Sequence, residues 1–166
     1  MCIRGRHISK LNNFIKLLRV LKSKKIKIVF DFNIRPSRWN KKNLNIFLDK
    51  VLKFVDICFL SGEDMNYWKN KNNIKSYEKI VRKYKIKHSI FRKNAEYTYA
   101  FLNKTRYVLK NKLLINVVDT SGAGDGFNAA YLSNFIVNND PVLALKAGSS
   151  LGSKIVMKKG AIVDVK

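Results

Sequence analysis

Residues 119–125 read DTSGAGD, and they lie between a hydrophobic run typical of a strand and a pattern typical of a helix. Two glycines that flank an alanine let the backbone turn tightly and bring its N–H groups close to a ligand. N–H groups at the amino end of a helix form a pocket for an anion such as phosphate. The segment therefore predicts a strand, a tight turn and a helix, with an anion pocket at residues 122–124.

Asp125 follows this predicted pocket directly. A carboxylate beside a phosphate would repel it if the site only held the anion. The same carboxylate is useful as a general base, which accepts a proton from an attacking hydroxyl group while the backbone stabilises the developing charge. The structural alternative is a first-turn carboxylate that the helix dipole favours.

Hydrophobic periodicity on both sides of residues 119–125 predicts alternating helices and strands. We expect helices at 8–21, 40–55, 76–84 and 141–158. A further helix begins at about residue 63, and another follows the glycine turn and ends at about residue 137. We expect strands at 25–30, 56–60, 88–91, 97–102, 106–109 and 113–118, with residues 103–104 as a hairpin turn. Asn40 and Asp140 are expected to cap helices. This order predicts an α/β fold with a doubly wound, mostly parallel sheet and helices on both faces, in one domain over residues 1–166.

The chain is strongly basic, with 34 Lys and Arg against 11 Asp and Glu and a formal charge of +23. Nucleic-acid binding is one interpretation. However, 26 of the cations are Lys, which 18 Asn and 16 Ile accompany, and all three have adenine- and thymine-rich codons. Lysines also occur throughout the chain. We therefore favour a solvated basic surface that attracts anions such as nucleotides, and we rank nucleic acid last among partners.

Two cysteines, Cys2 and Cys58, are far apart and match neither a metal-binding spacing nor a disulfide framework. No hydrophobic run approaches the roughly 18–20 residues that a membrane span needs. The amino end also lacks the apolar core of a secretion signal. We expect a cytoplasmic protein that does not contact membranes, with Cys58 in its core.

The segment DTSGAGD resembles the Asp-Thr-x-Gly-Ala-Gly-Asp signature of the ribokinase-like, or PfkB, family of carbohydrate kinases. Residues 30–39, FDFNIRPSRW, are similar to the Asp-x-Asn-x-Arg-Pro-x-x-Trp segment of 2-keto-3-deoxygluconate kinases and their fructokinase relatives. The resemblance implies a ribokinase-like fold and ATP-dependent phosphorylation of a sugar acid, with 2-keto-3-deoxygluconate the favoured acceptor. A fructokinase or another PfkB sugar kinase is the alternative within this class.

The resemblance also implies roles for individual residues. Asp125 would be the catalytic base, with the backbone of Gly122, Ala123 and Gly124 as the anion pocket, and Arg35 would contact the carboxylated sugar. The nucleotide-binding residues would be Asn33, Arg92, Lys93, Asn94, Thr120, Gly122 and Gly124. Asp64 would act on Mg²⁺ through water, and Asp119 and Ser121 would lie near a K⁺ ion with the 158–161 turn. Several family positions differ here, since Ser61 replaces an Asn, Asp64 a Glu and Asn94 the first glycine of the nucleotide turn, whose second glycine has no clear match.

The resemblance covers the carboxyl half of a family kinase. The sugar-binding glycine pair and the β-sheet lid of the amino half have no counterpart before Phe30. We expect the fold, truncated at its amino end, to be completed by self-association or by a separate amino half, because a half-site positions only one reactant. The alternative is a catalytically silent remnant that binds only the nucleotide.

Overall fold

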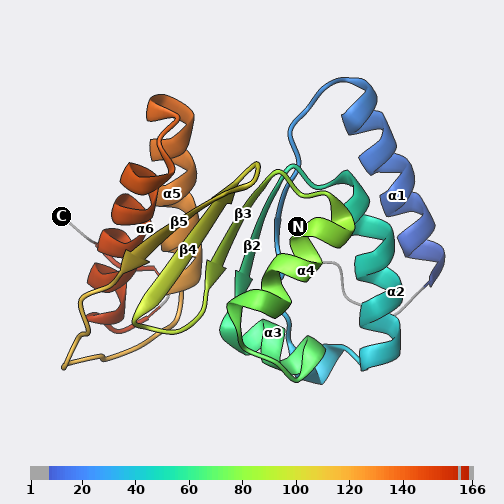
Figure 1. Ribbon diagram of the computed structural model, residues 1–166. Coiled ribbons are helices and arrows are strands. Elements are labelled where there is room, and N and C mark those ends of the chain that lie inside the picture. The colour runs from blue at the N-terminus through green and yellow to red at the C-terminus, as the bar shows by residue number, and fades with distance from the viewer. Residues whose placement is uncertain (1–7, 161, 165–166) are drawn as a thin grey trace. The chain divides into compact units, whose positions relative to one another are not determined.

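The computed structural model describes residues 8–160 and 162–164 of the chain (Figure 1). Two compact units make up the chain, Met1–Lys93 and Asn94–Lys166. Cys2 and the last residue of the 158–161 turn lie outside the described residues. The expectation of one domain over residues 1–166 stays a prediction.

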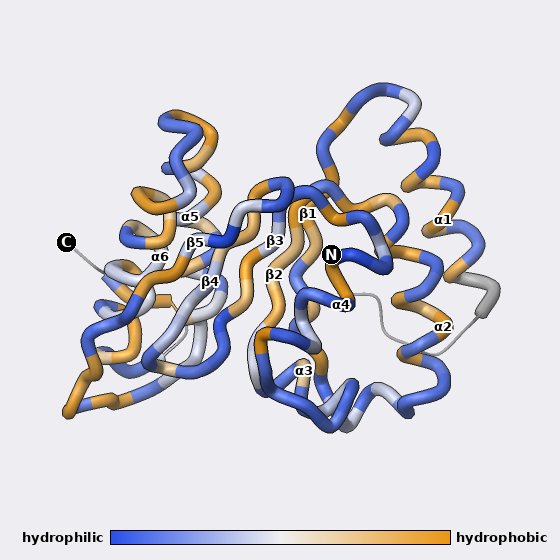
Figure 2. The backbone as a smooth tube through the Cα atoms, viewed as in Figure 1, coloured by the Kyte–Doolittle hydropathy of each residue, from blue (hydrophilic) through white to orange (hydrophobic). Residues whose placement is uncertain are grey.

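The first unit contains three parallel strands, β1 (Val29–Asp31), β2 (Ile57–Ser61) and β3 (His88–Arg92). In their register Phe30 lies opposite Cys58, and Leu60 lies opposite Phe91. The centre of β2 is fully buried, and the strand is drawn largely in hydrophobic colours in Figure 2. The predicted parallel arrangement is confirmed for these strands, which read as hydrophobic runs because both faces of such a sheet are covered.

Four helices accompany these strands, α1 (Ile8–Ser23), α2 (Lys41–Val51), α3 (Gly62–Lys69) and α4 (Ile74–Tyr84). Short 3-10 turns occur at Pro36–Arg38 and Leu52–Phe54. The predicted cap at Asn40 is confirmed, because its side chain accepts a hydrogen bond from the N–H of Asn43 at 2.8 Å.

Aromatic side chains pack α2, α3 and α4 against one face of these strands. The register places Phe30, Cys58 and Phe91 on the same face. The contacts of this layer are Phe30 with Phe47 of α2, Phe32 with Trp68 of α3, and Tyr77 of α4 with Phe91, at ring-centroid distances of 6.3, 5.5 and 4.5 Å. This layer forms the core of the first unit.

Cys58 lies in this core, as predicted. Its Sγ atom is 3.9 Å from the hydroxyl oxygen of Tyr77. Burial raises the pKa of the Cys58 thiol to about 12. The thiol therefore stays protonated at neutral pH and behaves as a small apolar side chain.

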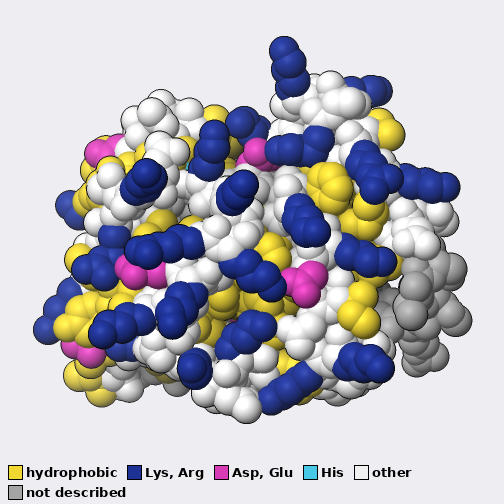
Figure 3. Space-filling model, turned by 45° about the vertical axis from the view of Figure 1, so that its right-hand side comes forward, with side chains coloured by type: hydrophobic (Ala, Val, Ile, Leu, Met, Phe, Trp, Pro, Cys, Tyr) yellow, Lys and Arg dark blue, Asp and Glu magenta, His cyan; other side chains and the backbone are white. Residues whose placement is uncertain are grey.

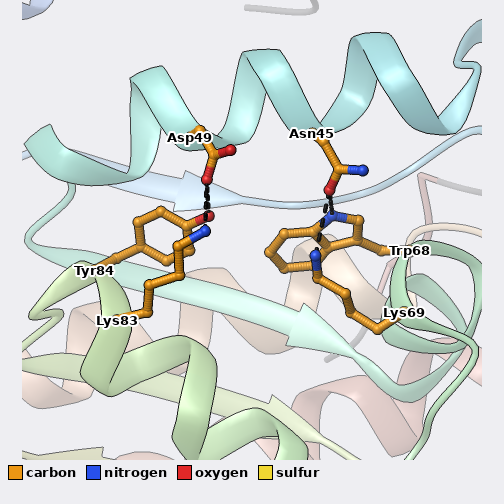
Figure 4. A network of polar contacts seen from close by, with 6 residues as sticks. All are labelled: Asn45, Asp49, Trp68, Lys69, Lys83 and Tyr84. Atoms are coloured by element: carbon orange, nitrogen blue, oxygen red, sulfur yellow. Dashed lines mark hydrogen bonds and ion pairs between the residues drawn. The ribbon is translucent and has the colours of Figure 1, made fainter.

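Polar contacts join α2 to α3 where Asn45 faces the indole of Trp68 (Figure 4). The side-chain oxygen of Asn45 accepts hydrogen bonds from Trp68 Nε1 at 2.7 Å and from Lys69 Nζ at 3.2 Å. This oxygen therefore satisfies the indole N–H of an otherwise buried side chain.

A second contact joins α2 to α4 through Asp49 (Figure 4). Its Oδ1 atom accepts hydrogen bonds from the hydroxyl group of Tyr84 and, at 2.9 Å, from Lys83 Nζ. These two bonds, that of Tyr84 first, lower the pKa of Asp49. The carboxylate is therefore charged at neutral pH and holds the carboxyl ends of the two helices together.

The second unit is built from a hairpin and two helices. Strands β4 (Tyr97–Leu102) and β5 (Thr105–Lys110) pair antiparallel, and Asn103 in the two-residue turn has a φ of +57°. This confirms the predicted hairpin, in which primed turns favour Asn. Helices α5 (Ala123–Asn138) and α6 (Pro141–Val156) follow, and α6 contacts both strands. Asp140 caps α6, as predicted.

Two strand predictions were wrong. Residues 113–118 form no strand in the described chain. Leu113 and Ile115 are 60% and 97% exposed, and the N–H of Val118 donates to the carbonyl of Val156 at the end of α6. The strand predicted at 25–30 begins only at Val29, because Lys25 has a φ of +59° in the turn that ends α1.

No helix among the described residues is both long enough and apolar enough to span a membrane.

His88 at the start of β3 should make folding sensitive to acid. The side chain is 4% exposed, and burial lowers its pKa to about 4 from 6.5. Below pH 6.5 the unfolded chain binds a proton that the folded chain does not, so stability falls as the pH falls towards 4. We expect about 2–3 kcal/mol less unfolding free energy from this group at pH 4.5 than at pH 7, measured by urea denaturation.

The matched variant for this experiment is His88→Leu. It should lose this part of the pH dependence between pH 7 and 4.5, whatever its stability at pH 7. An unchanged pH dependence in the variant would show that other groups cause the acid sensitivity.

Candidate functional site

Two segments of the first unit meet at Asp64, next to the carboxyl ends of β1 and β2. The carboxylate is 8% exposed, and its Oδ1 atom accepts a hydrogen bond from the N–H of Ile34 at 2.7 Å. Its Oδ2 atom accepts from the hydroxyl group of Ser61 at 2.8 Å, and the Ser61 hydroxyl in turn accepts from the N–H of Asp64 at 3.0 Å. The backbone N–H of Ser61 also donates to Asp64 Oδ2 at 3.5 Å, and this bond together with that from the Asp64 N–H to the Ser61 hydroxyl forms a capping box at the start of α3. Asp64 therefore fixes the segment after β1 to the start of α3.

The predicted ligand residues Asn33 and Arg35 lie on either side of this anchor. Asn33 has a φ of +36°, and both side chains are exposed. The hydrogen bond to Ile34 fixes the backbone between them. The anchor therefore presents Arg35 to solvent at the edge where the parallel strands end, which is the ligand-binding edge of such sheets.

The turn after β3 approaches α3 very closely. A Cβ atom built on Gly62 would lie 2.1 Å from the carbonyl oxygen of Lys93, and the same oxygen accepts a hydrogen bond from Asn72 Nδ2 at 3.2 Å. Arg92 and Lys93 therefore lie beside the start of α3. Sequence reasoning missed Gly62; the signal was a glycine directly after a predicted strand and before a helix.

Asn94, at the start of the second unit, organises the turn into β4. Its Oδ1 atom accepts hydrogen bonds from the N–H groups of Glu96 and Tyr97 at 3.1 and 2.9 Å. This is the local bonding by which Asn side chains stabilise turns. The Asn94 side chain, which we predicted to bind nucleotide, therefore also stabilises the backbone of the turn that follows it.

The segment DTSGAGD forms the start of α5 in the second unit. Gly122 is the N-cap residue with a φ of +76°, a conformation that glycine adopts without strain, and no side chain caps the helix. Ala123 and Gly124 are partly exposed, and Thr120 and Asp125 are exposed. The N–H of Ala123 donates to the carbonyl of Thr120 at 3.3 Å. The start of the helix and the Asp125 carboxylate are both accessible, and the helix dipole there favours an anion.

Asp119 ties this segment to the turn after α6. Its Oδ1 atom accepts from the N–H of Ser121 at 2.8 Å, and its Oδ2 atom accepts from the N–H of Gly160 at 2.9 Å. These hydrogen bonds lower the pKa of Asp119. The carboxylate is therefore ionised at neutral pH and holds the loop that precedes the pocket.

Three helical glycines let α6 pack closely against α5. A Cβ atom on Gly148 would lie 2.9 Å from the Phe127 carbonyl oxygen, and one on Gly126 would lie 2.1 Å from Ile155 Cδ1. One on Gly152 would lie 3.4 Å from the Ala123 carbonyl oxygen. This close contact fixes the position of α5 against α6 along its length, including its first turn at Ala123. These glycines were not predicted as functional; a glycine inside a helix, which costs about 1 kcal/mol, was the available signal.

The predicted site residues fall into two groups, one in each unit. The first unit brings Asn33, Arg35, Asp64, Arg92 and Lys93 to the carboxyl ends of its parallel strands. The second unit gathers residues 119–125 at the start of α5, with Asn94 at the start of its hairpin. Among the described residues, no cluster of three or more His, Cys, Asp or Glu side chains is arranged to hold a metal ion.

Comparison with known proteins finds related sequences. The model of a family described as pfkB family carbohydrate kinase matches residues 9–166. The chain is 29% identical over 155 residues to the 2-dehydro-3-deoxygluconokinase of Haemophilus influenzae, covering 90% of this chain and 49% of that protein. It is 26% identical over 150 residues to the 5-dehydro-2-deoxygluconokinase of Bacillus licheniformis, covering 87% and 45%. The chain spans about half the length of the curated relatives it matches.

Solved structures with a similar fold include two kinases. A putative ribokinase II from Escherichia coli aligns with a TM-score of 0.81 and 19% identity over 97% of this chain and 52% of that one. A fructokinase from Vibrio cholerae aligns with a TM-score of 0.80 and 20% identity over 95% and 53%. These alignments show a ribokinase-like α/β fold, which confirms the predicted fold class. The sheet is mixed, with β4 and β5 antiparallel, and the predicted doubly wound arrangement with helices on both faces stays a prediction.

Proposed function

We propose, since the chain belongs to the pfkB family of carbohydrate kinases, that it takes part in transfer of the γ-phosphoryl group of ATP to a hydroxyl group of a sugar acid. The observation that carries this proposal is the start of α5, where no side chain caps the helix and Asp125 is exposed in the first turn. The N–H groups of such a helix end can hold a phosphate, and the adjacent carboxylate can accept the proton of an attacking hydroxyl group.

In this proposal the hydroxyl oxygen of the acceptor attacks the γ-phosphorus of ATP, and Asp125 accepts the proton of that hydroxyl group. The N–H groups of residues 122–124 stabilise charge on the transferring phosphoryl oxygens, and ADP leaves. Thr120 and the group Asn33, Arg92, Lys93 and Asn94 would contact the nucleotide, and Arg35 would pair with the sugar carboxylate. Fixed backbone is well suited to this task, because it needs no reorganisation during the reaction.

Magnesium would accompany ATP and reduce the charge on its phosphates. Asp64, expected to act on it through water, already accepts hydrogen bonds from Ile34 and Ser61. Both oxygens of Asp119 likewise accept backbone N–H groups, so part of the acceptor capacity of this predicted potassium ligand is already used. These carboxylates fit a structural role better than direct metal binding, and the proposal includes no step through either metal.

The proposed acceptor is 2-keto-3-deoxygluconate, also named 2-dehydro-3-deoxygluconate. The Haemophilus influenzae relative carries the name of a kinase of this sugar acid, and the segment at residues 30–39 supports the same group of kinases. Fructose and 5-dehydro-2-deoxygluconate are the competing acceptors. A carboxylate on the acceptor would give the exposed guanidinium of Arg35 a partner that fructose lacks.

The second candidate function is binding of nucleotide without catalysis. It is supported by Asp64 and Asp119, whose oxygens already accept hydrogen bonds from the chain's own backbone, so that these carboxylates act in holding the loops. A site that positions the nucleotide and leaves the acceptor loose loses most of the advantage of proximity.

The deciding experiment measures ADP release by the purified chain with ATP, magnesium and each of the three acceptors. The kinase proposal expects release that depends on 2-keto-3-deoxygluconate, above the rate without acceptor. Activity per chain that rises with protein concentration would indicate that self-association completes the site. A folded chain that binds ATP and releases no ADP with any acceptor would contradict catalysis by this chain alone and favour the second candidate.

A further inference from the structure

The positive charge of the chain is concentrated in the first unit. Residues 1–93 contain 25 Lys and Arg against 6 Asp and Glu, whereas residues 94–166 contain 9 against 5. The net charges are therefore +19 and +4. Charge asymmetry of this kind between two parts of a chain is typical of proteins that bind polyanions.

This unequal distribution overturns the low rank that overall composition gave to nucleic acid among partners, because codon composition does not explain the asymmetry. Adenine- and thymine-rich codons raise Asn together with Lys, yet Asn is equally frequent in the two units, with 10 in residues 1–93 and 8 in residues 94–166. Arg is divided 7 to 1 in favour of the first unit. The excess of cations in this unit is therefore a local property of its surface.

Helices α2 and α4 present many of these cations side by side, since Lys83 and Asp49 join the two helices. We define the basic helical surface as six of the exposed cations on these helices and on the turns that follow them, Lys50, Lys53, Lys75, Lys79, Arg82 and Lys87. Two acidic residues lie on these helices, Asp49 of α2, which Lys83 and Tyr84 already bind, and the half-buried Glu78 of α4. Figure 3 shows Lys and Arg over much of the visible face and few Asp or Glu.

The surrounding side chains favour a nucleic-acid duplex as the partner. The apolar side of α4 is buried through Tyr77, Ile80 and Val81, so this helix has no hydrophobic face to insert into a membrane. None of the large hydrophobic side chains exposed in the described part of the chain is aromatic, so single-stranded bases find no stacking platform. Lysines without such platforms suit regularly spaced backbone phosphates.

We propose that the basic helical surface binds the phosphate backbone of double-stranded nucleic acid without sequence preference. The interaction is independent of the proposed kinase site. The exposed ammonium and guanidinium groups neutralise backbone phosphates and release the counterions bound to them. The affinity for the duplex therefore falls as the salt concentration rises.

The test uses the full chain, a fluorescein-labelled 20-base-pair DNA duplex and fluorescence anisotropy at several salt concentrations. The surface variant is Lys75→Gln/Lys79→Gln/Arg82→Gln. The matched control is Lys104→Gln/Lys112→Gln/Lys146→Gln, which removes the same charge from exposed positions of the second unit. Circular dichroism melts check that both variants fold, and Gln preserves helix propensity.

We expect saturable binding of the duplex by the wild-type chain at about 50 mM salt, with a log-linear loss of affinity as salt rises. The surface variant should bind about 10-fold or more weakly and reduce the salt slope by about 3, or roughly 0.9 for each lost contact. The control should change affinity less than about 3-fold, because it leaves the phosphate contacts intact.

Four results would overturn the proposal. They are absence of binding at this salt, equal losses in the two variants, displacement of the duplex by ATP at matched ionic strength, and tighter binding to vesicles that contain phosphatidylserine. Equal losses would mean that total charge attracts the duplex. Displacement by ATP would place the duplex on the nucleotide site, and vesicle binding would identify a membrane surface.

Discussion

Asp125→Asn is expected to lower the turnover number at least about 100-fold and to leave ATP affinity within about 3-fold of the wild type. Asn has nearly the same size as Asp but cannot accept the proton of the attacking hydroxyl group. The residue lies in the first turn of α5, beside the N–H groups proposed to hold the phosphoryl oxygens. Its replacement therefore removes the base and leaves the pocket. Turnover is measured by ADP release and affinity by calorimetry with ATP.

Asp140→Asn is the matched control for this prediction. It also exchanges a carboxylate for an amide at a helix amino end of the second unit, and Asn caps helices about as well as Asp. We expect its turnover to equal that of the wild type. If Asp125→Asn retains full turnover, Asp125 is not the base. If it loses ATP binding in parallel with turnover, the carboxylate has a structural role at the helix start.

Gly62→Ala is expected to reduce the free energy of unfolding by about 2–3 kcal/mol. The added Cβ atom would lie 2.1 Å from the Lys93 carbonyl oxygen and 2.7 Å from both side-chain polar atoms of Asn72. A backbone carbonyl moves only if the turn after β3 moves with it. The same displacement shifts Lys93, so ATP affinity should also fall. Urea denaturation followed by circular dichroism measures the loss of stability.

Gly126→Ala provides the comparison at the same nominal distance. Its Cβ atom would also lie 2.1 Å from the nearest atom, but that atom is Cδ1 of Ile155, the end of a flexible side chain. A rotamer change relieves this contact, and Ala favours the helix by up to about 1 kcal/mol. We expect a net change within about 1 kcal/mol. Equal destabilisation by the two variants would show that backbone contact at Gly62 is not the cause.

Local sequence patterns predicted most of the elements correctly because the responsible interactions are local. Asn40 and Asp140 cap helices through hydrogen bonds within three residues, and Asn103 adopts the positive φ of a hairpin turn. Hydrophobic runs identified β2 and β3. The same reasoning failed at residues 113–118, because a hydrophobic run describes side chains and does not provide a neighbouring strand.

The candidate site was predictable where one continuous segment forms it. DTSGAGD places an uncapped helix end and a carboxylate together through local backbone geometry, and the structure contains that arrangement. Asp64 differs, because its principal partner, Ile34, is 30 residues away in the chain. The family resemblance implied a role near magnesium for Asp64, whereas its hydrogen bonds anchor the segment that carries Arg35.

The sequence by itself determined the signature at residues 119–125, the parallel strands of the first unit, the hairpin of the second and the family to which the chain belongs. Only the tertiary structure determined that Gly62 lies against the Lys93 carbonyl, that Asp119 holds Gly160, and that α6 packs closely on α5. The first set depends on propensities and hydrogen bonds between neighbours in the chain. The second depends on which distant atoms come into contact, and such contacts exist only after the elements have packed.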